Sequence, residues 1–246
     1  MRFGILLVGL FLSLIAQAAP LLTVTEDWPP YTTMRNPQQA DGAYARVVRT
    51  ALQRSGLPDN IQVYPWARSL AQARLRPDTL LFALARTSQR ESLFLWLAPL
   101  DTVAVYLWHS PGSSPQKLTQ IRDCCSICTV RQDANLEALR ESGFSMQRVV
   151  QANSNADCLR LLQHGSVQYL ALPGPLLKIL LEQQGLPADS LQRGPLLQRY
   201  RLYLAASLGT EQRTIQTLRR QLQQMQNSGE QQRIILHVLQ QAGSRP

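Results

Sequence analysis

Arg90 is the side chain in this sequence whose type and setting best suit the binding of an anion. Ser88 and Glu91 have the spacing of a capping box, so we expect a short helix from Ser88 with Arg90 in its first turn. Backbone N–H groups and the dipole at a helix start favour an anion, and a guanidinium adds a bidentate pair. The alternative is a surface arginine that pairs with Glu91 or Glu26. Arg86 precedes the same turn and either adds a second cationic contact or braces the loop.

Four aromatic side chains follow the first two expected strands: Trp28, Tyr31, Tyr64 and Trp66. Loops at the carboxyl ends of strands rim the crevice of an open α/β sheet, where aromatic faces enclose apolar or cationic groups. Tyr31 and Trp66 are the preferred pair, since two prolines pin Trp28, although a place in the core explains any one of them equally well. Glu26 ends the first strand, where it either receives an ammonium group or pairs with an arginine.

Cysteine chemistry is the next candidate, because the chain has four cysteines: Cys124, Cys125, Cys128 and Cys158. The C-x-x-C from Cys125 to Cys128 leads into an expected strand rather than opening a helix, which argues against a thioredoxin-type redox site. Adjacent Cys124 and Cys125 make a tetrahedral zinc site awkward. We expect a structural disulfide from Cys128 or Cys125 to Cys158, with Cys128–Cys158 preferred, and no metal or cofactor.

The elements that must position these residues alternate between strands and helices, which predicts an α/β fold. The expected strands are residues 21–25, 61–64, 80–85, 103–108, 126–130, 149–151, 167–172 and 200–208. The expected helices are residues 42–56, the segments after Pro65 and from Ser88, and residues 133–142, 156–163, 175–184, 211–225 and 228–240. Ser228 and Gln231 have the spacing of a capping box for the last helix.

These elements form two α/β blocks joined by two crossovers, near residues 103–109 and 200–208. Lobe 1 is expected to comprise residues 19–104 and 204–246, and lobe 2 residues 105–203. A cleft between two lobes is a natural place for a small ligand.

Residues 1–18 have the layout of a secretory signal peptide, with Arg2, an apolar run over 5–15 and a small-x-small site at 16–18. The apolar run is too short to span a bilayer comfortably, and no cysteine follows the site to carry a lipid anchor. We therefore expect cleavage near Ala18 and a soluble, monomeric protein in the periplasm, an oxidising compartment.

The net charge of +9 over 246 residues comes almost wholly from arginine, which pairs well with carboxylates and phosphates. Export argues against a nucleic-acid partner.

The three histidines, His109, His164 and His237, stand in no nucleophile or metal motif. The sequence therefore predicts a binding protein rather than an enzyme.

Four stretches together resemble the family 3 periplasmic solute-binding proteins, the amino-acid-type receptors of ABC importers: residues 23–31, 64–68, 86–91 and 153–167. The similarity is to short members of unknown ligand. It implies a bilobal fold that closes over a small solute by hinge motion. It also implies that Arg90 holds the ligand's carboxylate, with Arg86 and Thr87 in the same motif.

The sequence departs from this family where the ligand's ammonium group is usually held. Ala83 and Ala85 stand where hydroxyl side chains are usual, and residues 169–174 lack the usual carboxylate. A charged ammonium without a partner in a dry cleft is costly, which weakens the case for an ordinary α-amino acid.

We therefore expect a protein that closes over a small carboxylate-bearing solute, an amino acid or a related organic anion, and delivers it to a membrane partner such as an ABC permease. One alternative is a sensory or interaction module that signals to a membrane receptor. A less favoured one is a cleft enzyme of the dehydratase type, for which Glu26 is the evident acid or base.

Overall fold

The computed structural model describes residues 20–36, 39–112 and 117–243. The expected signal peptide, residues 1–18, lies outside them. The strands are β1 (Leu22–Thr25), β2 (Thr33–Asn36), β3 (Gln39–Asp41), β4 (Ile61–Val63), β5 (Thr79–Ala85), β6 (Leu95–His109), β7 (Ile127–Val130), β8 (Val149–Ala152), β9 (Tyr169–Pro173) and β10 (Gln192–Ala206). The helices are α1 (Ala43–Arg54), α2 (Trp66–Leu75), α3 (Leu118–Cys124), α4 (Ala134–Glu141), α5 (Asn155–Gln163), α6 (Gly174–Gln183), α7 (Gln212–Asn227) and α8 (Glu230–Gly243), with short 3-10 turns η1 (Glu91–Leu93) and η2 (Met146–Arg148).

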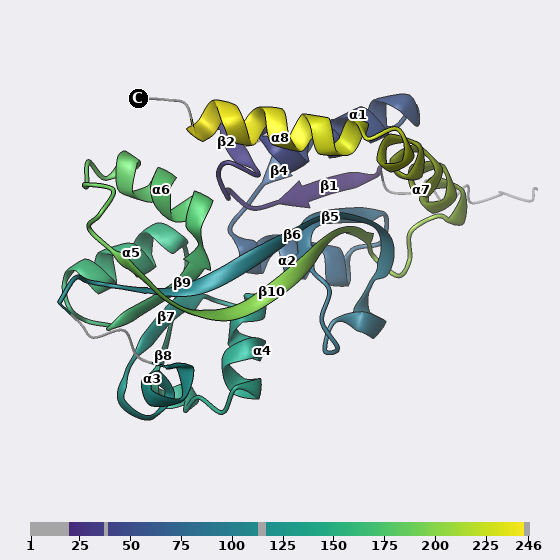
Figure 1. The fold of residues 1–246 in the computed structure, drawn as a ribbon. Coiled ribbons are helices and arrows are strands. Elements are labelled where there is room, and N and C mark those ends of the chain that lie inside the picture. The colour runs from purple at the N-terminus through teal and green to yellow at the C-terminus, as the bar shows by residue number, and fades with distance from the viewer. Residues whose placement is uncertain (1–19, 37–38, 113–116, 244–246) are drawn as a thin grey trace, which may run out of the picture.

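One eight-stranded sheet with the order β4-β1-β5-β10-β6-β9-β7-β8 runs through both halves of the molecule (Figure 1). Lobe 1 holds the parallel strands β4, β1 and β5, and lobe 2 holds the parallel strands β9, β7 and β8. The long strands β6 and β10 pair antiparallel between them and connect the lobes (Figure 1). The predicted α/β fold with two lobes and two crossovers is confirmed.

Helices cover both faces of the lobe 1 sheet. Successive strand residues point to opposite faces, and in β5 the residues on both faces are apolar and need to be covered. Leu80 and Phe82 of β5 pack in the cluster that contains α1, while Leu81 packs with Trp66 and Leu70 of α2. Helices α1, α7 and α8 also contact one another. The apolar face predicted for α7 is buried, at Ile215, Leu218, Leu222 and Met225.

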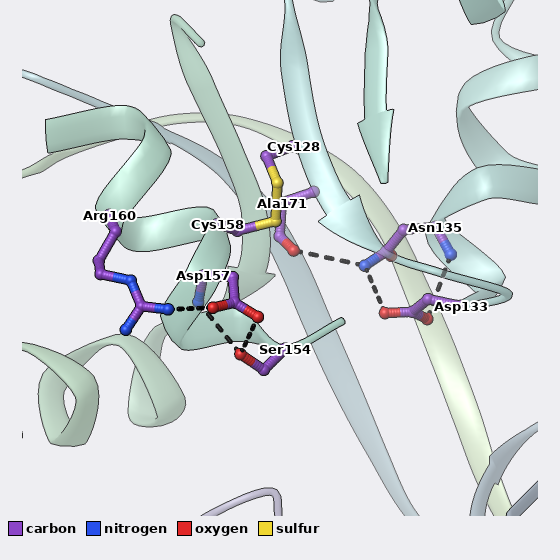
Figure 2. The surroundings of a disulfide bond; sticks show 8 residues. All are labelled: Cys128, Asp133, Asn135, Ser154, Asp157, Cys158, Arg160 and Ala171. Atoms are coloured by element: carbon purple, nitrogen blue, oxygen red, sulfur yellow. Dashed lines mark hydrogen bonds and ion pairs between the residues drawn. A yellow bond between two sulfur atoms is a disulfide. The ribbon is translucent and has the colours of Figure 1, made fainter. Parts of the chain in front are cut away.

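A disulfide ties β7 to α5 in lobe 2 (Figure 2). It joins Cys128 and Cys158, the pairing preferred from the sequence, and both residues are fully buried. The structure pairs Cys124 with its neighbour Cys125. The bond between Cys128 and Cys158 therefore joins a strand of the lobe 2 sheet covalently to a helix that packs on it.

The expected helix from Ser88 is not formed, so Arg90 does not lie in the first turn of a helix. Residues 88–90 form a turn, and the following η1 spans only Glu91–Leu93, with Arg90 at its start and no side-chain cap. The capping box fails because the carboxylate of Glu91 is taken by Arg86, whose Nε lies 2.8 Å from Glu91 Oε2.

The capping box expected for α8 is also incomplete, because Ser228 makes a local contact but Gln231 does not reach back to it. The Ser228 hydroxyl accepts from the backbone N–H of Glu230, at 3.4 Å. The Gln231 side chain instead donates to the carbonyl oxygens of Pro99 and Leu100, which anchors α8 to β6.

Candidate functional site

A small cavity lies where lobe 1, lobe 2 and the two connecting strands meet. Its lining from lobe 1 comprises Glu26, Trp28, Trp66, Ala83, Ala85 and Arg90; β6 and β10 add Val103, Val105, Tyr200 and Leu202; and lobe 2 adds Asp133, Ala134, Asn135, Asn155, Ala171, Leu172 and Pro173. About 40 Å³ is open to the centres of water molecules, enough for a few of them. The lobes are thus closed around a polar space.

Arg90 reaches from lobe 1 into lobe 2. Its Nε donates to Glu137 Oε1 of α4 at 3.0 Å, and its Nη2 donates to the carbonyl oxygen of Gln132 at 2.9 Å. Arg90 is 4% exposed. Because buried ion pairs are strong only with their hydrogen bonds in place, these contacts hold the guanidinium firmly at the cavity.

Trp66 makes a second contact between the lobes at the same carbonyl. Its Nε1 donates to the oxygen of Gln132 at 2.9 Å, and the Arg90 guanidinium lies 5.7 Å from the Trp66 ring centroid. Gln132 has a φ of 60°, a left-handed conformation that is uncommon for a residue with a side chain. The turn after β7 therefore presents one carbonyl oxygen to two lobe 1 donors.

Two carboxyl groups, one from each lobe, face the cavity. Burial raises the pKa of Glu26 well above its usual value, and the negative charges of Asp133 and Asp27 raise it further, while Arg90 opposes them. Burial likewise raises the pKa of Asp133, again with Arg90 opposing. The two carboxyl groups can receive a cationic group. A cation beside them would offset the cost of burying their negative charges and would reduce the repulsion between them.

Asp133 is held at the start of α4 by its own neighbour (Figure 2). Its Oδ1 accepts from the backbone N–H of Asn135 at 3.3 Å, which caps the helix, and its Oδ2 accepts from Asn135 Nδ2 at 3.2 Å. Asn135 Nδ2 also lies 3.4 Å from the carbonyl oxygen of Ala171 in β9. These bonds fix the Asp133 carboxylate against the lobe 2 sheet.

Two buried polar atoms of the cavity lining, the Tyr200 hydroxyl and Asn135 Oδ1, have no hydrogen-bond partner among the described residues. Burial raises the pKa of Tyr200, so its hydroxyl stays protonated and can donate. Because buried polar groups are almost always paired in native proteins, we expect these two atoms to form hydrogen bonds with water or with a ligand.

The apolar floor of the cavity includes Ala83 and Ala85 of β5. Ala83 has a φ of 60°, and the pairing of β5 with β10 shifts register between Tyr203 and Ala205, beside this point. A bulge that bends a strand is typical of sites where a ligand approaches the sheet.

Of the six predicted ligand-binding residues, the structure brings three together at the cavity: Arg90, Glu26 and Trp66. Tyr31 is 4% exposed and stacks on Tyr44 with ring centroids 4.8 Å apart, in the lobe 1 core. The core explanation therefore applies to Tyr31, which lies outside the cavity lining.

Arg86 and Thr87 also lie outside the lining. Arg86 pairs with Glu91, and its guanidinium lies 5.3 Å from the ring centroids of both Trp96 and Tyr203, so it braces the loop. Thr87 accepts from the backbone N–H of Arg90 through its carbonyl oxygen. Its buried Oγ1 has no partner among the described residues, and its contact with a ligand stays a prediction.

Asp133, Asn135, Glu137 and Tyr200 are the site residues that sequence reasoning missed. A signal for Asp133 was present, because an Asp at the start of an expected helix that follows an expected strand is a helix cap at the sheet's carboxyl edge. The pairing of Glu137 with Arg90 joins residues 47 positions apart and has no local signal.

Among residues 20–36, 39–112 and 117–243, no cluster of His, Cys, Asp or Glu is suited to a metal ion. Nor does any helix within these ranges have the length and apolarity needed to cross a membrane.

The chain matches no protein-family model and no curated protein, so its similarity to known proteins is structural. One similar solved structure is EhuB in complex with hydroxyectoine, with a TM-score of 0.78 and 17% identity over 92% of this chain and 91% of that chain. Another is the arginine-, lysine-, histidine-binding protein ArtJ from Geobacillus stearothermophilus, with a TM-score of 0.78 and 13% identity over 93% and 97%. A third is a histidine kinase sensor domain with similarity to periplasmic binding proteins, with a TM-score of 0.77 and 17% identity over 89% and 96%.

These matches cover nearly all of both chains, so this chain has the bilobal fold of the periplasmic binding proteins. The resemblance to solute-binding proteins predicted from the sequence is confirmed at the level of the fold. At these identities the likeness shows the fold, whereas the ligand depends on the residues of the site itself.

Proposed function

We propose that this protein is a periplasmic solute-binding protein that closes its two lobes over a small solute carrying both a carboxylate and an amino group. The observation that supports this most is the cavity between the lobes, in which Arg90 stands beside Glu26 and Asp133. The Arg90 guanidinium would hold the solute's carboxylate, taking over from Glu137, and the two carboxyl groups would hold its ammonium group.

The charge of the cavity favours a zwitterion over a simple organic anion. Arg90 already pairs with Glu137, and Glu26 and Asp133 face the same space, so an anion without an amino group would leave these two carboxyl groups without a cationic partner. The lobe 2 carboxylate that seemed missing near residues 169–174 would be supplied by Asp133 of the β7–α4 turn. The Tyr200 hydroxyl and Asn135 Oδ1 would complete the ligand's hydrogen bonds.

Closure would use residues 19–104 with 204–246 as lobe 1 and residues 105–203 as lobe 2, with the hinge in β6 and β10. We infer that the closed form delivers the solute to a membrane partner such as an ABC permease. The second candidate is a sensory module, favoured by the likeness to the histidine kinase sensor domain, in which the closed form signals to a membrane receptor.

A matched set of ligands tests the proposed site. Leucine, 4-methylpentanoate and isoamylamine share one apolar group but carry both charges, only the carboxylate, or only the ammonium. We expect leucine to raise the Tm of the mature protein by mass action, and the other two to raise it much less.

Variants locate this binding at the cavity. Arg90→Ala should weaken leucine binding at least about thirtyfold in calorimetry, because a buried charge would lose its partner. Arg74→Ala, in the exposed part of α2, should leave it unchanged. Binding of 4-methylpentanoate as tight as that of leucine, or full binding by Arg90→Ala, would contradict the proposal.

A further inference from the structure

A second space, which we call the outer groove, adjoins the cavity on the side of β2 and α6. It has a volume of about 350 Å³ and shares three lining residues with the cavity: Glu26, Trp66 and Asn155. Lobe 1 contributes the segments after β1 and β4, and lobe 2 contributes the start of α5 and one face of α6. The outer groove is thus reached directly from the place where the solute's amino group would sit.

The walls of the outer groove are mainly apolar. Met34 and Val63 line it from lobe 1, and Leu176 and Leu180 line it from α6. Met34 is 47% exposed, so part of this apolar wall faces solvent. Covering such a wall with an apolar group would be favourable, since it removes apolar surface from water.

The described lining of the outer groove has acidic side chains and no basic ones. Among the described residues that line it, Glu26 and Asp27 supply two carboxyl groups, and no lysine or arginine is present. The chain as a whole has 25 basic and 16 acidic residues, so this local excess of acid runs against the average. An acidic side chain would be repelled here.

We propose that the outer groove receives the side chain of the solute, and that the solute is an amino acid with a bulky apolar side chain, such as leucine, methionine or phenylalanine. This rests on the proposed function, because the cavity must hold the amino and carboxyl groups for the side chain to point outward. The cavity has space only for such a head group, and the groove has the volume of a small-molecule site.

The two-sided lining gives the side chain a role in closure. Val63 and Met34 belong to lobe 1, while Leu176 and Leu180 belong to lobe 2, so a group in the groove contacts both lobes at once. An apolar side chain would therefore stabilise the closed form, whereas a solute without one would fill only the cavity.

Calorimetric titration of the mature protein with glycine, alanine, leucine, phenylalanine, glutamate and arginine tests this inference. Leucine and phenylalanine should bind at least about tenfold more tightly than alanine, since each would bury more apolar surface in the groove. Glutamate should bind most weakly of the larger amino acids. Arginine should bind less tightly than leucine, because the groove would strip water from its guanidinium.

Two matched variants locate the side chain. Met34→Ser should weaken leucine binding about threefold to tenfold and leave alanine binding unchanged. Leu236→Ser, at 46% exposure on α8 and outside the groove lining, should change neither.

Equal affinities for alanine and leucine, or a Met34→Ser variant that binds leucine normally, would overturn the role of the groove while leaving the proposed function intact. Tighter binding of arginine than of leucine would also overturn the apolar class. If no amino acid in the series binds, the proposed function itself fails.

Discussion

Arg90 already has a carboxylate partner within its own chain. The ion pair with Glu137 joins two nearly buried side chains, and Gln132 satisfies a second N–H of the same guanidinium. A solute's carboxylate must therefore compete with Glu137 rather than fill an empty place. Only a solute that also meets Glu26 and Asp133 adds interactions that Glu137 cannot offer.

The raised pKa of Glu26 makes the folding stability of the ligand-free protein depend on pH. A carboxyl group whose pKa is raised by burial binds a proton more readily in the folded protein, so its contribution favours folding at low pH and is lost as pH rises through the raised pKa. We expect Glu26→Gln to raise the Tm of the ligand-free protein at pH 7 by about 2–4 °C, the shift that 1 kcal/mol produces in a chain of this size.

Differential scanning fluorimetry from pH 4 to pH 8 measures this effect. The gain from Glu26→Gln should shrink toward pH 4, where the native carboxyl is already protonated. Glu141→Gln, exposed on α4, should show no such gain at any pH. A Glu26→Gln variant that is less stable than the native protein at pH 7 would mean that the buried Glu26 carboxyl group does not destabilise the fold at that pH.

At the scale of elements, one residue at the start of α4 both caps the helix and contributes a carboxyl group to the site. Asp133 caps α4 and also faces the cavity. Asparagine caps helices about as well as aspartate, whereas alanine does not. The two roles can therefore be separated by substitution.

We expect Asp133→Asn to keep the Tm within about 2 °C of the native value but to weaken amino-acid binding about tenfold or more, because the ammonium loses one carboxylate. Asp133→Ala should lose binding and also about 1 kcal/mol of stability, the worth of the cap. Paired calorimetry and thermal unfolding measure both. Normal binding by Asp133→Asn would mean that Asp133 does not hold the ammonium group.

The two disulfides should differ sharply in their worth. Cys128–Cys158 closes a loop with a sequence separation of 30, for which the chain-entropy model gives about 3–4 kcal/mol. Cys124–Cys125 joins neighbours and closes no such loop. The double variant Cys128→Ala, Cys158→Ala should lose about 6–16 °C in Tm, while Cys124→Ala, Cys125→Ala should lose far less.

Thermal unfolding of both double variants, with peptide mapping of the native protein without reductant, makes this comparison. Similar losses in the two variants would show that the effect comes from replacing cysteine side chains rather than from loop closure. Four free thiols in the native protein would contradict both bonds.

An element could be predicted from the sequence when its own residues carry a clear pattern of apolar and polar positions. The helix α7 was predictable because its apolar residues recur with helical spacing and all pack on one side. The hairpin of β2 and β3 was missed because β2 is exposed along its whole length and carries no alternating pattern. Helix α3 was missed for a similar reason, since Ile121 is its one buried residue.

The same distinction applies to the site. Arg90 and Trp66, which line the cavity, were predicted because each belongs to a recognisable local motif. Arg86 and Tyr31 belong to those motifs too, but Glu91 and Tyr44 hold them elsewhere. No local pattern shows that Glu137 reaches Arg90, or that Gln132 serves both Trp66 and Arg90. These contacts arise only when the lobes meet.

At the scale of the whole molecule, a few polar contacts hold the lobes together around the cavity. They converge on Arg90, which meets Glu137 and Gln132, and on Trp66, which meets Gln132. A ligand shifts the equilibrium between the open and the closed form only as far as it binds the closed form more tightly than the open form. The strength of the Arg90–Glu137 pair therefore helps set how far the protein closes without a ligand.

We expect Glu137→Ala to open the ligand-free protein. Removing one partner of a buried ion pair leaves the other charge buried and unpaired, a cost of about 3–5 kcal/mol that opening the cleft would relieve. Since about 1.4 kcal/mol is a tenfold change in an equilibrium, the ratio of closed to open molecules should fall by at least about a hundredfold. Small-angle X-ray scattering should then give a larger radius of gyration for the variant than for the native protein.

An amino-acid ligand should close this variant again, because its carboxylate can replace the missing Glu137 beside Arg90. Addition of leucine should return the scattering of Glu137→Ala to that of the native protein. Glu141→Ala, further along α4 and exposed, is the control and should scatter like the native protein throughout. Identical scattering from ligand-free Glu137→Ala and native protein would mean that the closed form does not depend on this ion pair, and that the hinge strands and the Trp66 contact suffice to hold it.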